Sequence, residues 1–328
     1  MPKLTYIAEP GIINLSYSKS KVLHECPRKF QLRENFRTGE HFVNIHTAFG
    51  HAYAAAIQCW FTTKDYELCL LSAMAHWDLP QLMGCEPPRN SRKCFEEVLI
   101  AFDIFIESIY PLYFEGKWEI AQLDSHPAVE LLYYLAIGDK FAHQGHIDLI
   151  LQSVETGALC VAEIKTSERA VHPSQWSNSA QTLTYTVLCD ELAKQYGLHN
   201  EYQVIYIIYN PKQEEGLGHT VYHFQKPASL KVEAINTILM ECNQIATYED
   251  AGFYPKNGDS CYSFFRACEL YGLCDMAGDG KLVQPQNSQY AIVPLEAADL
   301  YVRIEDLAAL SPEYGSSNQP TLIPAECI

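Results

Sequence analysis

Apolar residues recur at helical spacing in the first third of the chain and in short, mostly apolar runs after it. The helical spacing predicts four helices, over residues 15–37, 46–63, 65–75 and 91–109. Pro27 is expected to break or restart the first of them. In the second helix one stripe carries the large residues Phe49, Tyr53, Ile57 and Trp60. The first third is therefore predicted to be mainly helical.

Short runs rich in Val, Ile and Tyr, bounded by turn residues, predict strands further along the chain. They cover residues 129–137, 141–152, 159–166 and 204–209. A helix over residues 175–196 is predicted before the last of these strands. It is expected to end at Gly197, which suits the left-handed position after a helix. Another helix is predicted over 228–248, so the fold class is α/β with helical N-terminal additions.

The changes in pattern divide the chain into three predicted regions. Residues 1–120 form a helical N-terminal part, and residues 121–275 form an α/β core that ends in a cysteine cluster. Residues 276–328 are predicted to be an acidic, loop-rich tail outside that core, with one short helix near residues 304–310. The segment 275–328 has a net charge of −6, from two basic and eight acidic residues.

Composition narrows the class of protein. With 48% apolar and 19% charged residues, bulk disorder is excluded. The longest apolar run, residues 131–137, is too short to cross a bilayer, so no membrane association is expected. The N-terminus has no secretory signal, and the twelve cysteines of so large a chain favour a reducing compartment. We therefore expect a cytoplasmic protein of a bacterial or phage-infected cell. Its net charge of −17 allows nucleic-acid binding only in a local groove, such as the basic stretch Lys19–Arg37.

One predicted hairpin concentrates the candidate chemistry. Its two apolar runs, within residues 141–166, flank a turn at residues 155–157. In an antiparallel hairpin Asp148 and Glu163 lie opposite each other, and Lys165 shares one face with Glu163. Two clustered carboxylates suit Mg²⁺, and a neighbouring lysine can orient or activate a metal-bound water. The alternative is a surface hairpin that carries only a solvated pair of charges.

Several motifs, in this order, resemble the PD-(D/E)xK nucleases of the RecB/AddB type, including phage-encoded exonucleases. They are Ser16-Tyr17-Ser18-Lys19-Ser20 through Cys26-Pro27-Arg28-Lys29-Phe30, then Gly50-His51, Gly145-x-x-Asp148, Glu163-x-Lys165 and Gln181-x-x-x-Tyr185. The resemblance covers about residues 14–276, although the segment before the aspartate has no proline. It implies a central mixed sheet of the restriction-endonuclease-like type, flanked by helices, and metal-dependent cleavage of DNA.

The resemblance also implies the metal ligands. Asp148 and Glu163 would hold Mg²⁺ (or Mn²⁺), with the backbone carbonyl near Ile164 helping. His51 would offer a neutral imidazole as an extra ligand. Without the family context, His51 would be an ordinary hydrogen-bonded histidine on a helix. Glu130 is either a further acidic member near the metal or a solvated residue on a strand.

Three more residues of the motifs receive roles in the same way. Lys165 would steer the attacking water and stabilise the charge that develops in the transition state. Gln181 and Tyr185 lie one turn apart on a helix and would contact the DNA strand or brace the site. Ordinary helix packing is the alternative for this pair. Trp176 and Tyr185 are expected to stack on the bases of single-stranded DNA with little base specificity.

A cysteine cluster near the C-terminus predicts a second site. Cys261, Cys268 and Cys274 are spaced C-x6-C-x5-C, which leaves one thiolate missing from a site of four. The resemblance implies that Cys26 is the fourth ligand and that the site holds a [4Fe–4S] cluster. Such a cluster would join the two ends of the nuclease region and close a long loop. A zinc site and three unrelated buried cysteines are the alternatives.

The leading functional hypothesis is a Mg²⁺-dependent DNA exonuclease that acts on single strands or free DNA ends and contains an iron–sulfur cluster. One alternative is a catalytically silent, nuclease-like subunit that binds DNA, or a protein partner through the acidic tail. Another is an RNA nuclease or an endonuclease, which would share the chemistry and differ in substrate or cleavage mode.

Overall fold

The computed structural model describes most of the chain. The described residues are 5–7, 9, 11–35, 45–77, 92–169, 172–213, 218–227, 229–263, 266–276, 291–293, 295 and 298–309. The chain divides into two compact units. Unit 1 comprises residues 1–2, 42–133 and 146–234, and unit 2 comprises residues 3–41, 134–145 and 235–328.

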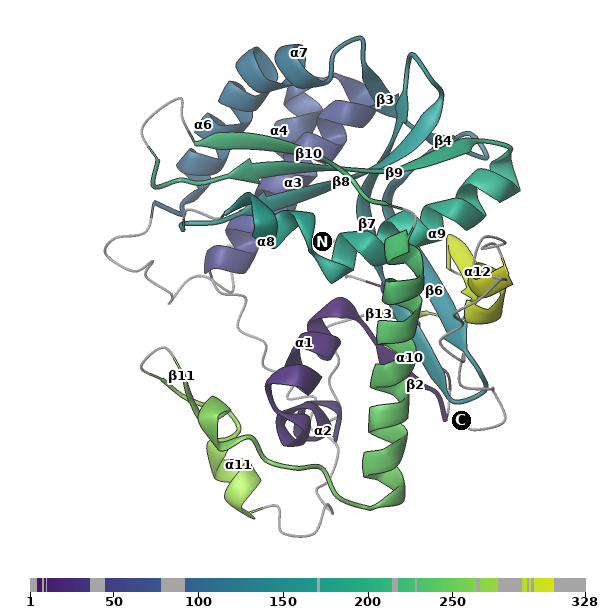
Figure 1. Cartoon of the computed structure of the whole chain (residues 1–328). Helices are drawn as coiled ribbons and strands as arrows, with labels where there is room; N and C mark the ends of the chain where they lie inside the picture. Colours follow the sequence, from purple (N-terminus) through teal and green to yellow (C-terminus); the bar gives the residue numbers. More distant parts are fainter. Residues whose placement is uncertain are drawn as a thin grey trace. The chain divides into compact units, whose positions relative to one another are not determined.

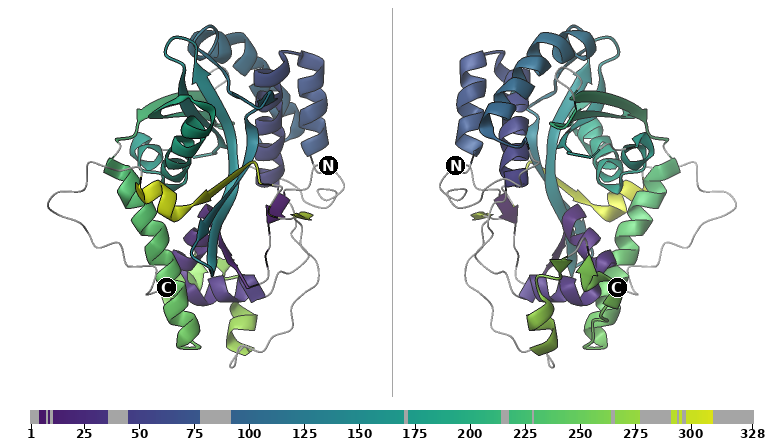
Figure 2. Two further views of the ribbon diagram at one scale, coloured as in Figure 1. Left: turned by 90° about the vertical axis from the view of Figure 1, so that its right-hand side faces the viewer. Right: turned by 90° about the vertical axis from the view of Figure 1, so that its left-hand side faces the viewer.

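A helical layer covers one face of the sheet in unit 1 (Figure 1). Its members are α3 (Ile45–Thr63), α4 (Tyr66–His76), α6 (Phe95–Ile104), the π-helical turn η1 (Phe105–Ile109) and α7 (Tyr110–Tyr113). Figure 2 shows α3 and α4 packed side by side. The Asp65 side chain caps α4 by accepting a hydrogen bond from the Leu68 amide at 3.1 Å. The apolar stripe of α3 is buried on the sheet, as its spacing predicted.

The sheet of unit 1 has the strand order β10-β9-β8-β7-β6, with β3 paired to the far end of β7. The strands are β3 (Trp118–Ile120), β6 (Val129–Ile137), β7 (Phe141–Ser153), β8 (Ala158–Thr166), β9 (His199–Tyr209) and β10 (His219–Gln225). The sheet is mixed because β8 and β9 are parallel, whereas β7 and β8 form the predicted antiparallel hairpin. A small pair, β4 (Gln122–Leu123) and β5 (His126–Pro127), stands apart from it.

Two helices cover the other face of this sheet: α8 (Pro173–Ser177) and α9 (Ala180–Tyr196) (Figure 1). The single helix predicted over 175–196 is therefore interrupted, because a turn at Asn178 ends α8 before Ser179 starts α9. The predicted end at Gly197 is confirmed, since this residue has φ 64°. Helix α10 (Ser229–Asp250) follows β10 and continues into unit 2.

Unit 2 joins the N-terminal residues to the later part of the chain. It contains β1 (Thr5–Ile7), β2 (Ile13–Leu15), α1 (Tyr17–Glu25), α2 (Pro27–Asn35), η2 (Gly258–Ser260), β11 (Tyr262–Ser263), β12 (Arg266–Ala267), α11 (Tyr271–Met276), β13 (Ala291–Val293), β14 (Leu300–Arg303) and α12 (Ile304–Ala309). Helix α1 ends at Glu25 and α2 begins at Pro27. The backbone of Cys26 between them is extended, with φ −163°. Proline at position 27 favours that break, because it disfavours a helical conformation in the residue before it.

Part of the predicted tail belongs to the fold. Strand β14 lies next to β6, and Tyr301 stacks on Tyr134 with ring centroids 6.0 Å apart. Four apolar side chains of β14 and α12 are buried: Leu300, Val302, Ile304 and Leu307. The alternation of apolar and polar residues in β14 covers only four residues, which is too short to predict a strand from sequence. Much of the rest of the segment 276–328 lies outside the described residues.

The predicted fold class is confirmed: a central mixed sheet is flanked by helices. Among the described residues, every helix is too short or too polar to cross a bilayer. The proposed boundaries at residues 120 and 275 stay a prediction.

Candidate active site

The end of the β7–β8 hairpin brings the predicted catalytic residues together. The ladder pairs Leu149 with Ala162, which places Asp148 opposite Glu163 as the sequence predicted. At this position the Asp148 Oδ2 atom accepts a hydrogen bond from the Ile164 amide at 2.8 Å. The backbone ladder is thus replaced by a side-chain contact, and the carboxylate is held at the point where the two strands separate.

Glu163 is completely buried, with 0% of its side chain exposed. It forms an ion pair with Lys165, and among the described residues no other group donates a hydrogen bond to it. Burial, together with repulsion from Asp148, raises the pKa of Glu163 to about 8, although Lys165 opposes the shift. This carboxylate is therefore short of positive charge and of hydrogen-bond donors.

Asp148 and Lys165 complete the centre of the site. Burial raises the pKa of Asp148, against the opposing effects of Lys165 and the Ile164 amide. Burial by itself would lower the pKa of Lys165, but the two carboxylates outweigh it and raise the pKa above its ordinary value. The raised pKa keeps the Lys165 ammonium group charged. About one-third of the side chain is exposed, so this group can reach a molecule at the mouth of the site.

His51 and Glu130 border the same centre. His51 is exposed on α3 and interacts electrostatically with Asp148. Glu130 accepts a hydrogen bond from the Gln58 amide at 2.6 Å and has an unusual backbone φ of 50°. Loss of hydration around the carboxyl group, together with the nearby Asp148, raises the pKa of Glu130 to about 7, although Gln58 and Lys165 oppose the shift. Glu130 therefore belongs to the acidic cluster.

Gln181 and Tyr185 contact each other on α9, next to the acidic residues. The Gln181 side-chain amide donates to the Tyr185 hydroxyl at 2.9 Å, one helical turn along. Tyr185 is only 3% exposed, so the expectation that it stacks on bases is wrong. The burial follows from its contact with Tyr133, whose ring centroid lies 5.7 Å away.

A wall of tyrosines around Glu163 escaped the sequence analysis. Tyr133, Tyr185 and Tyr206 are all buried and all interact electrostatically with Glu163. Tyr206 faces Glu163 across the parallel β8–β9 pair. In sequence, Tyr133 and Tyr206 are indistinguishable from apolar strand residues. Gln58 offered a signal, because it is a polar residue on the apolar face of α3.

The donor set fits a hard divalent cation. Three carboxylates gather around a single lysine, and both oxygens of the buried Glu163 lack a hydrogen-bond partner other than that lysine. As the side chains stand, no three His, Cys, Asp or Glu residues of the described part converge as ligands. Carboxylate oxygens in surplus over positive charge are ligands that a hard divalent cation such as Mg²⁺ prefers.

Comparison with known proteins places the chain in a family. Residues 14–275 match the PD-(D/E)XK nuclease superfamily. The chain belongs to this superfamily. The matched segment contains His51, Asp148, Glu163 and Lys165, so the hairpin end is the candidate active site of a PD-(D/E)XK nuclease.

Two solved structures were found to be similar. One is a protein named "Putative exonuclease" from Eubacterium rectale, with 13% identity, a TM-score of 0.45, and coverage of 84% of this chain and 91% of that one. The other is the protein SSO0001, with 14% identity, a TM-score of 0.29, and coverage of 72% of this chain and 79% of that one. No curated protein matches the sequence significantly.

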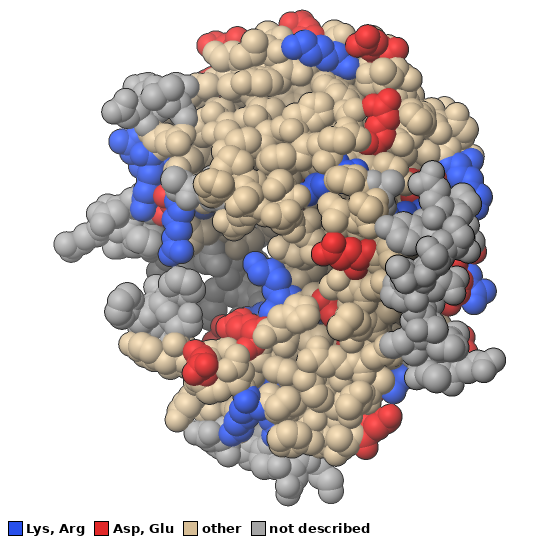
Figure 3. Space-filling model, viewed as in Figure 1, with Lys and Arg blue, Asp and Glu red and all other residues tan. Residues whose placement is uncertain are grey.

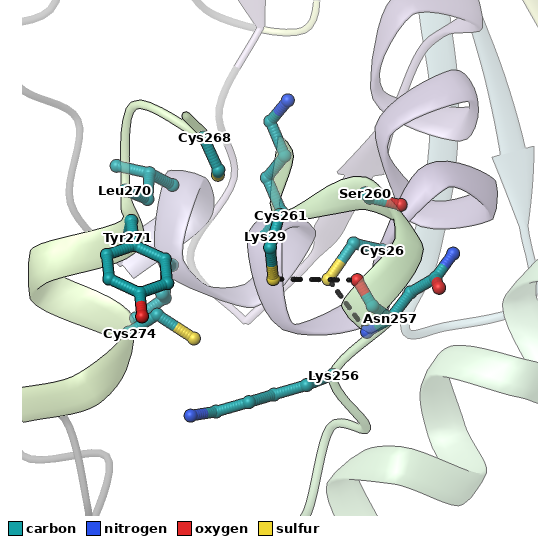
Figure 4. Close-up of a pocket in the computed structure, with 11 residues that line it drawn as sticks. Cys26, Lys29, Lys256, Asn257, Ser260, Cys261, Cys268, Leu270, Tyr271 and Cys274 are labelled. Carbon is teal, nitrogen blue, oxygen red and sulfur yellow. Dashed lines mark hydrogen bonds between the residues drawn. The ribbon is translucent and has the colours of Figure 1, made fainter. Parts of the chain in front are cut away.

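Unit 2 of this PD-(D/E)XK protein assembles the second set of candidate residues. One pocket is lined by all four predicted cysteines, Cys26, Cys261, Cys268 and Cys274, together with Lys29, Lys256 and Tyr271 (Figure 4). The ten cysteines of the described residues are free thiols. The four thiols at the pocket do not stand in a metal-binding arrangement. Loss of hydration and the three neighbouring cysteines raise the pKa of the Cys261 thiol.

Direct contacts hold the two segments of this pocket together. The Cys26 sulfur accepts a hydrogen bond from the Asn257 amide at 3.4 Å, and the Cys261 thiol donates to the Asn257 carbonyl at 3.7 Å (Figure 4). The Ser260 hydroxyl donates to the Glu25 carbonyl at 2.6 Å. These contacts join the junction of α1 and α2 to the segment 257–261.

The predicted basic stretch is partly neutralised. Lys29 pairs with Glu25 at 3.2 Å, and Arg33 pairs with Glu269, while Arg37 lies outside the described residues. On the face shown in Figure 3, lysine and arginine side chains of the described residues are interspersed with carboxylates. This face shows no single basic field, so DNA contacts are expected to be local.

Proposed function

We propose that the chain is a metal-dependent DNA exonuclease that hydrolyses phosphodiester bonds with Mg²⁺ or Mn²⁺. One observation carries the proposal: Asp148, Glu163 and Lys165 converge at the end of one hairpin, within the segment that matches the superfamily. The set Asp148, Glu163 and Lys165 is intact, which favours an active enzyme over a catalytically silent subunit.

The residues present suggest a division of labour. A bound divalent cation would polarise the phosphate and lower the pKa of a water molecule. Asp148, Glu163 and the carbonyl of Ile164 would hold that cation, with His51 as an additional ligand. Lys165 is charged and partly exposed, so it can orient the attacking water and stabilise the negative charge that develops on the phosphate oxygens. Gln181 and Tyr185 would position these groups from α9.

Activity on end-labelled single-stranded and double-stranded DNA tests this function. Wild-type protein with Mg²⁺ should release nucleotides from an end, and EDTA should stop the reaction. Asp148→Ala, Glu163→Ala and Lys165→Ala should each lower the cleavage rate by at least about a thousandfold, because each removes a group that acts on the reacting atoms. Asp103→Ala, on α6 in the helical layer, is the matched control for the loss of a carboxylate.

The products decide between the alternatives. Internal fragments would indicate an endonuclease, and cleavage of RNA alone would indicate a different substrate. Full activity of any of the three alanine variants would contradict the assignment. A wild-type protein that binds DNA and never cleaves it would support the silent subunit, which would recruit its partner through acidic residues of the segment 276–328.

We further infer that Cys26, Cys261, Cys268 and Cys274 hold a [4Fe–4S] cluster in unit 2. The support is that all four cysteines line one pocket and none is engaged in a disulfide. Four thiolates are the usual ligands of such a cluster, whereas zinc sites more often show paired C-x2-C spacing. Its role would be structural, adding a covalent link to a contact that already exists.

Spectroscopy tests the cluster independently of cleavage. Protein purified without oxygen should be brown and should contain iron and sulfide. Cys26→Ser or Cys268→Ser should bleach the colour, whereas Cys59→Ser on α3 should not. Colourless wild-type protein that binds zinc, or that binds no metal, would contradict the proposal.

A further inference from the structure

A row of aromatic side chains runs across the sheet from the candidate active site to its edge. Tyr206 on β9 is the cross-strand neighbour of Glu163 on β8, and Tyr222 on the edge strand β10 is the neighbour of Tyr206. Phe224, two residues along β10, points to the same face. Its ring centroid lies 6.1 Å from that of Tyr206 and 5.7 Å from that of Tyr222.

Trp176 on α8 completes this set, which we call the aromatic row: Trp176, Tyr206, Tyr222 and Phe224. The Trp176 ring lies 5.0 Å from the Tyr206 ring, centroid to centroid. Helix α8 is fixed in this place because the buried Lys226 donates a hydrogen bond to the Ser177 carbonyl. The row is therefore a fixed surface, set by the sheet on one side and by an anchored helix on the other.

The ring of the aromatic row next to the active site is buried, and the rings further from it are partly exposed. Tyr206 is 1% exposed and forms its inner end, whereas Trp176, Tyr222 and Phe224 are partly exposed. The Tyr206 hydroxyl is engaged with Thr182 at 2.9 Å, so the inner ring is locked. A cation lies at each end, since Lys165 interacts with Tyr206 and Lys226 lies 5.9 Å from the Phe224 ring.

We propose that the exposed faces of Trp176, Tyr222 and Phe224 stack on the nucleobases of a single DNA strand whose backbone enters the active site. The inference rests on the nuclease activity proposed above and names the substrate class of that same site. Partly exposed aromatic rings that lead directly to a phosphodiesterase centre suit a ligand that alternates flat bases with phosphates. Stacking does not depend on base identity, because every base has a π-face.

Two oligonucleotides of equal length separate base stacking from charge. One is a thymidine oligonucleotide, and the other is an abasic strand with the same number of phosphates. Binding is measured by fluorescence anisotropy in EDTA, which prevents cleavage. Wild-type protein should prefer the thymidine strand by about five- to a hundredfold for each stacked base. Trp176→Ala and Phe224→Leu should each lose the share of one stacked base, about five- to a hundredfold of this preference, and leave the affinity for the abasic strand unchanged.

Matched variants keep the test sharp if an alanine variant fails to fold. Trp176→Phe retains a π-face and should keep the preference, whereas Phe224→Leu retains apolar volume and should lose it. Tyr113→Ala removes an exposed tyrosine from α7, in the helical layer, and should behave as wild type. Intrinsic fluorescence adds a direct signal, because DNA should quench wild-type emission and should not do so in Trp176→Phe.

Two results would overturn the proposal. The first is equal affinity of wild-type protein for the thymidine and the abasic strand. The second is a Trp176→Ala variant that keeps the wild-type preference, or that weakens binding of both strands equally. Both results are compatible with a protein that cleaves DNA with Mg²⁺. They would refute the stacking proposal and leave the proposed nuclease activity intact. A wild-type protein that neither binds nor cleaves DNA would instead contradict the proposed function.

Discussion

The Glu163 carboxylate is fully buried, lies beside Asp148 and has Lys165 as its ion-pair partner. Such a group destabilises a metal-free fold, because ionisation in a buried, acidic surrounding is unfavourable. Proteins tolerate this kind of conflict at functional sites, where activity requires it. Changes to Glu163 should therefore move stability and activity in opposite directions.

Glu163→Gln should raise the free energy of unfolding of the metal-free protein by about 1–3 kcal/mol near neutral pH. The folded-state pKa of about 8 lies above the ordinary value of 4.5, so wild-type stability falls as pH rises from 4.5 to 8. The glutamine variant should lose much of this dependence. Urea unfolding in EDTA at several pH values measures both effects. A glutamine variant less stable than wild type at pH 8 would contradict the prediction.

His219 should make the protein sensitive to acid. Its Nε2 atom is 2.7 Å from the Tyr53 hydroxyl, and burial lowers its pKa to about 4 from 6.5. The stabilisation is present above pH 6.5 and is lost as pH falls towards 4, because only the unfolded chain takes up the proton readily. Between pH 6.5 and pH 4, the free energy of unfolding of His219→Gln should fall by about 1–3 kcal/mol less than that of wild-type protein. The exposed His126, changed to Gln, is the control; equal slopes in the two variants would refute the effect.

At the scale of elements, β14 and α12 link the end of the chain to the sheet. An apolar side chain that is completely buried contributes about 1.5–3 kcal/mol to the free energy of unfolding. Ending the chain after residue 299 removes the four buried residues named above and should lower the melting temperature by several degrees or prevent folding. Ending it after residue 309 keeps every described residue and serves as the control. Unchanged thermal unfolding of the shorter protein would show that β14 and α12 contribute little.

At the scale of the whole molecule, the −17 net charge and the acidic hairpin end make a cation the natural stabiliser. Mg²⁺ should raise the melting temperature of wild-type protein, since a ligand at a hundredfold excess over its Kd adds about 2.7 kcal/mol. Asp148→Asn should abolish most of this gain, and equal concentrations of NaCl should not reproduce it. An equal Mg²⁺ effect in both proteins would place the ion elsewhere.

The sequence by itself determined the elements whose signals are local. The stripe of α3, the left-handed Gly197 and the β7–β8 hairpin follow from periodicity and turn residues within short windows. The hairpin also predicted that Asp148 and Glu163 would face each other, because antiparallel pairing around a turn fixes which residues are opposite. The ordered motifs added His51 and the α9 pair, Gln181 and Tyr185.

Only the tertiary structure decided what surrounds those residues. Glu130 joins the acidic cluster through Gln58, and Tyr206 reaches Glu163 across a parallel strand pair separated by more than thirty residues of sequence. Parallel and edge pairings such as β8–β9, β9–β10 and β6–β14 carry no turn between neighbours that would set their register. Their partners are chosen by burial of whole faces, which depends on the complete chain. For that reason the hairpin of the candidate active site and a stacking role for Trp176 could be predicted from sequence. The tyrosine wall and the neighbours of Trp176 in the aromatic row, Tyr206, Tyr222 and Phe224, could not.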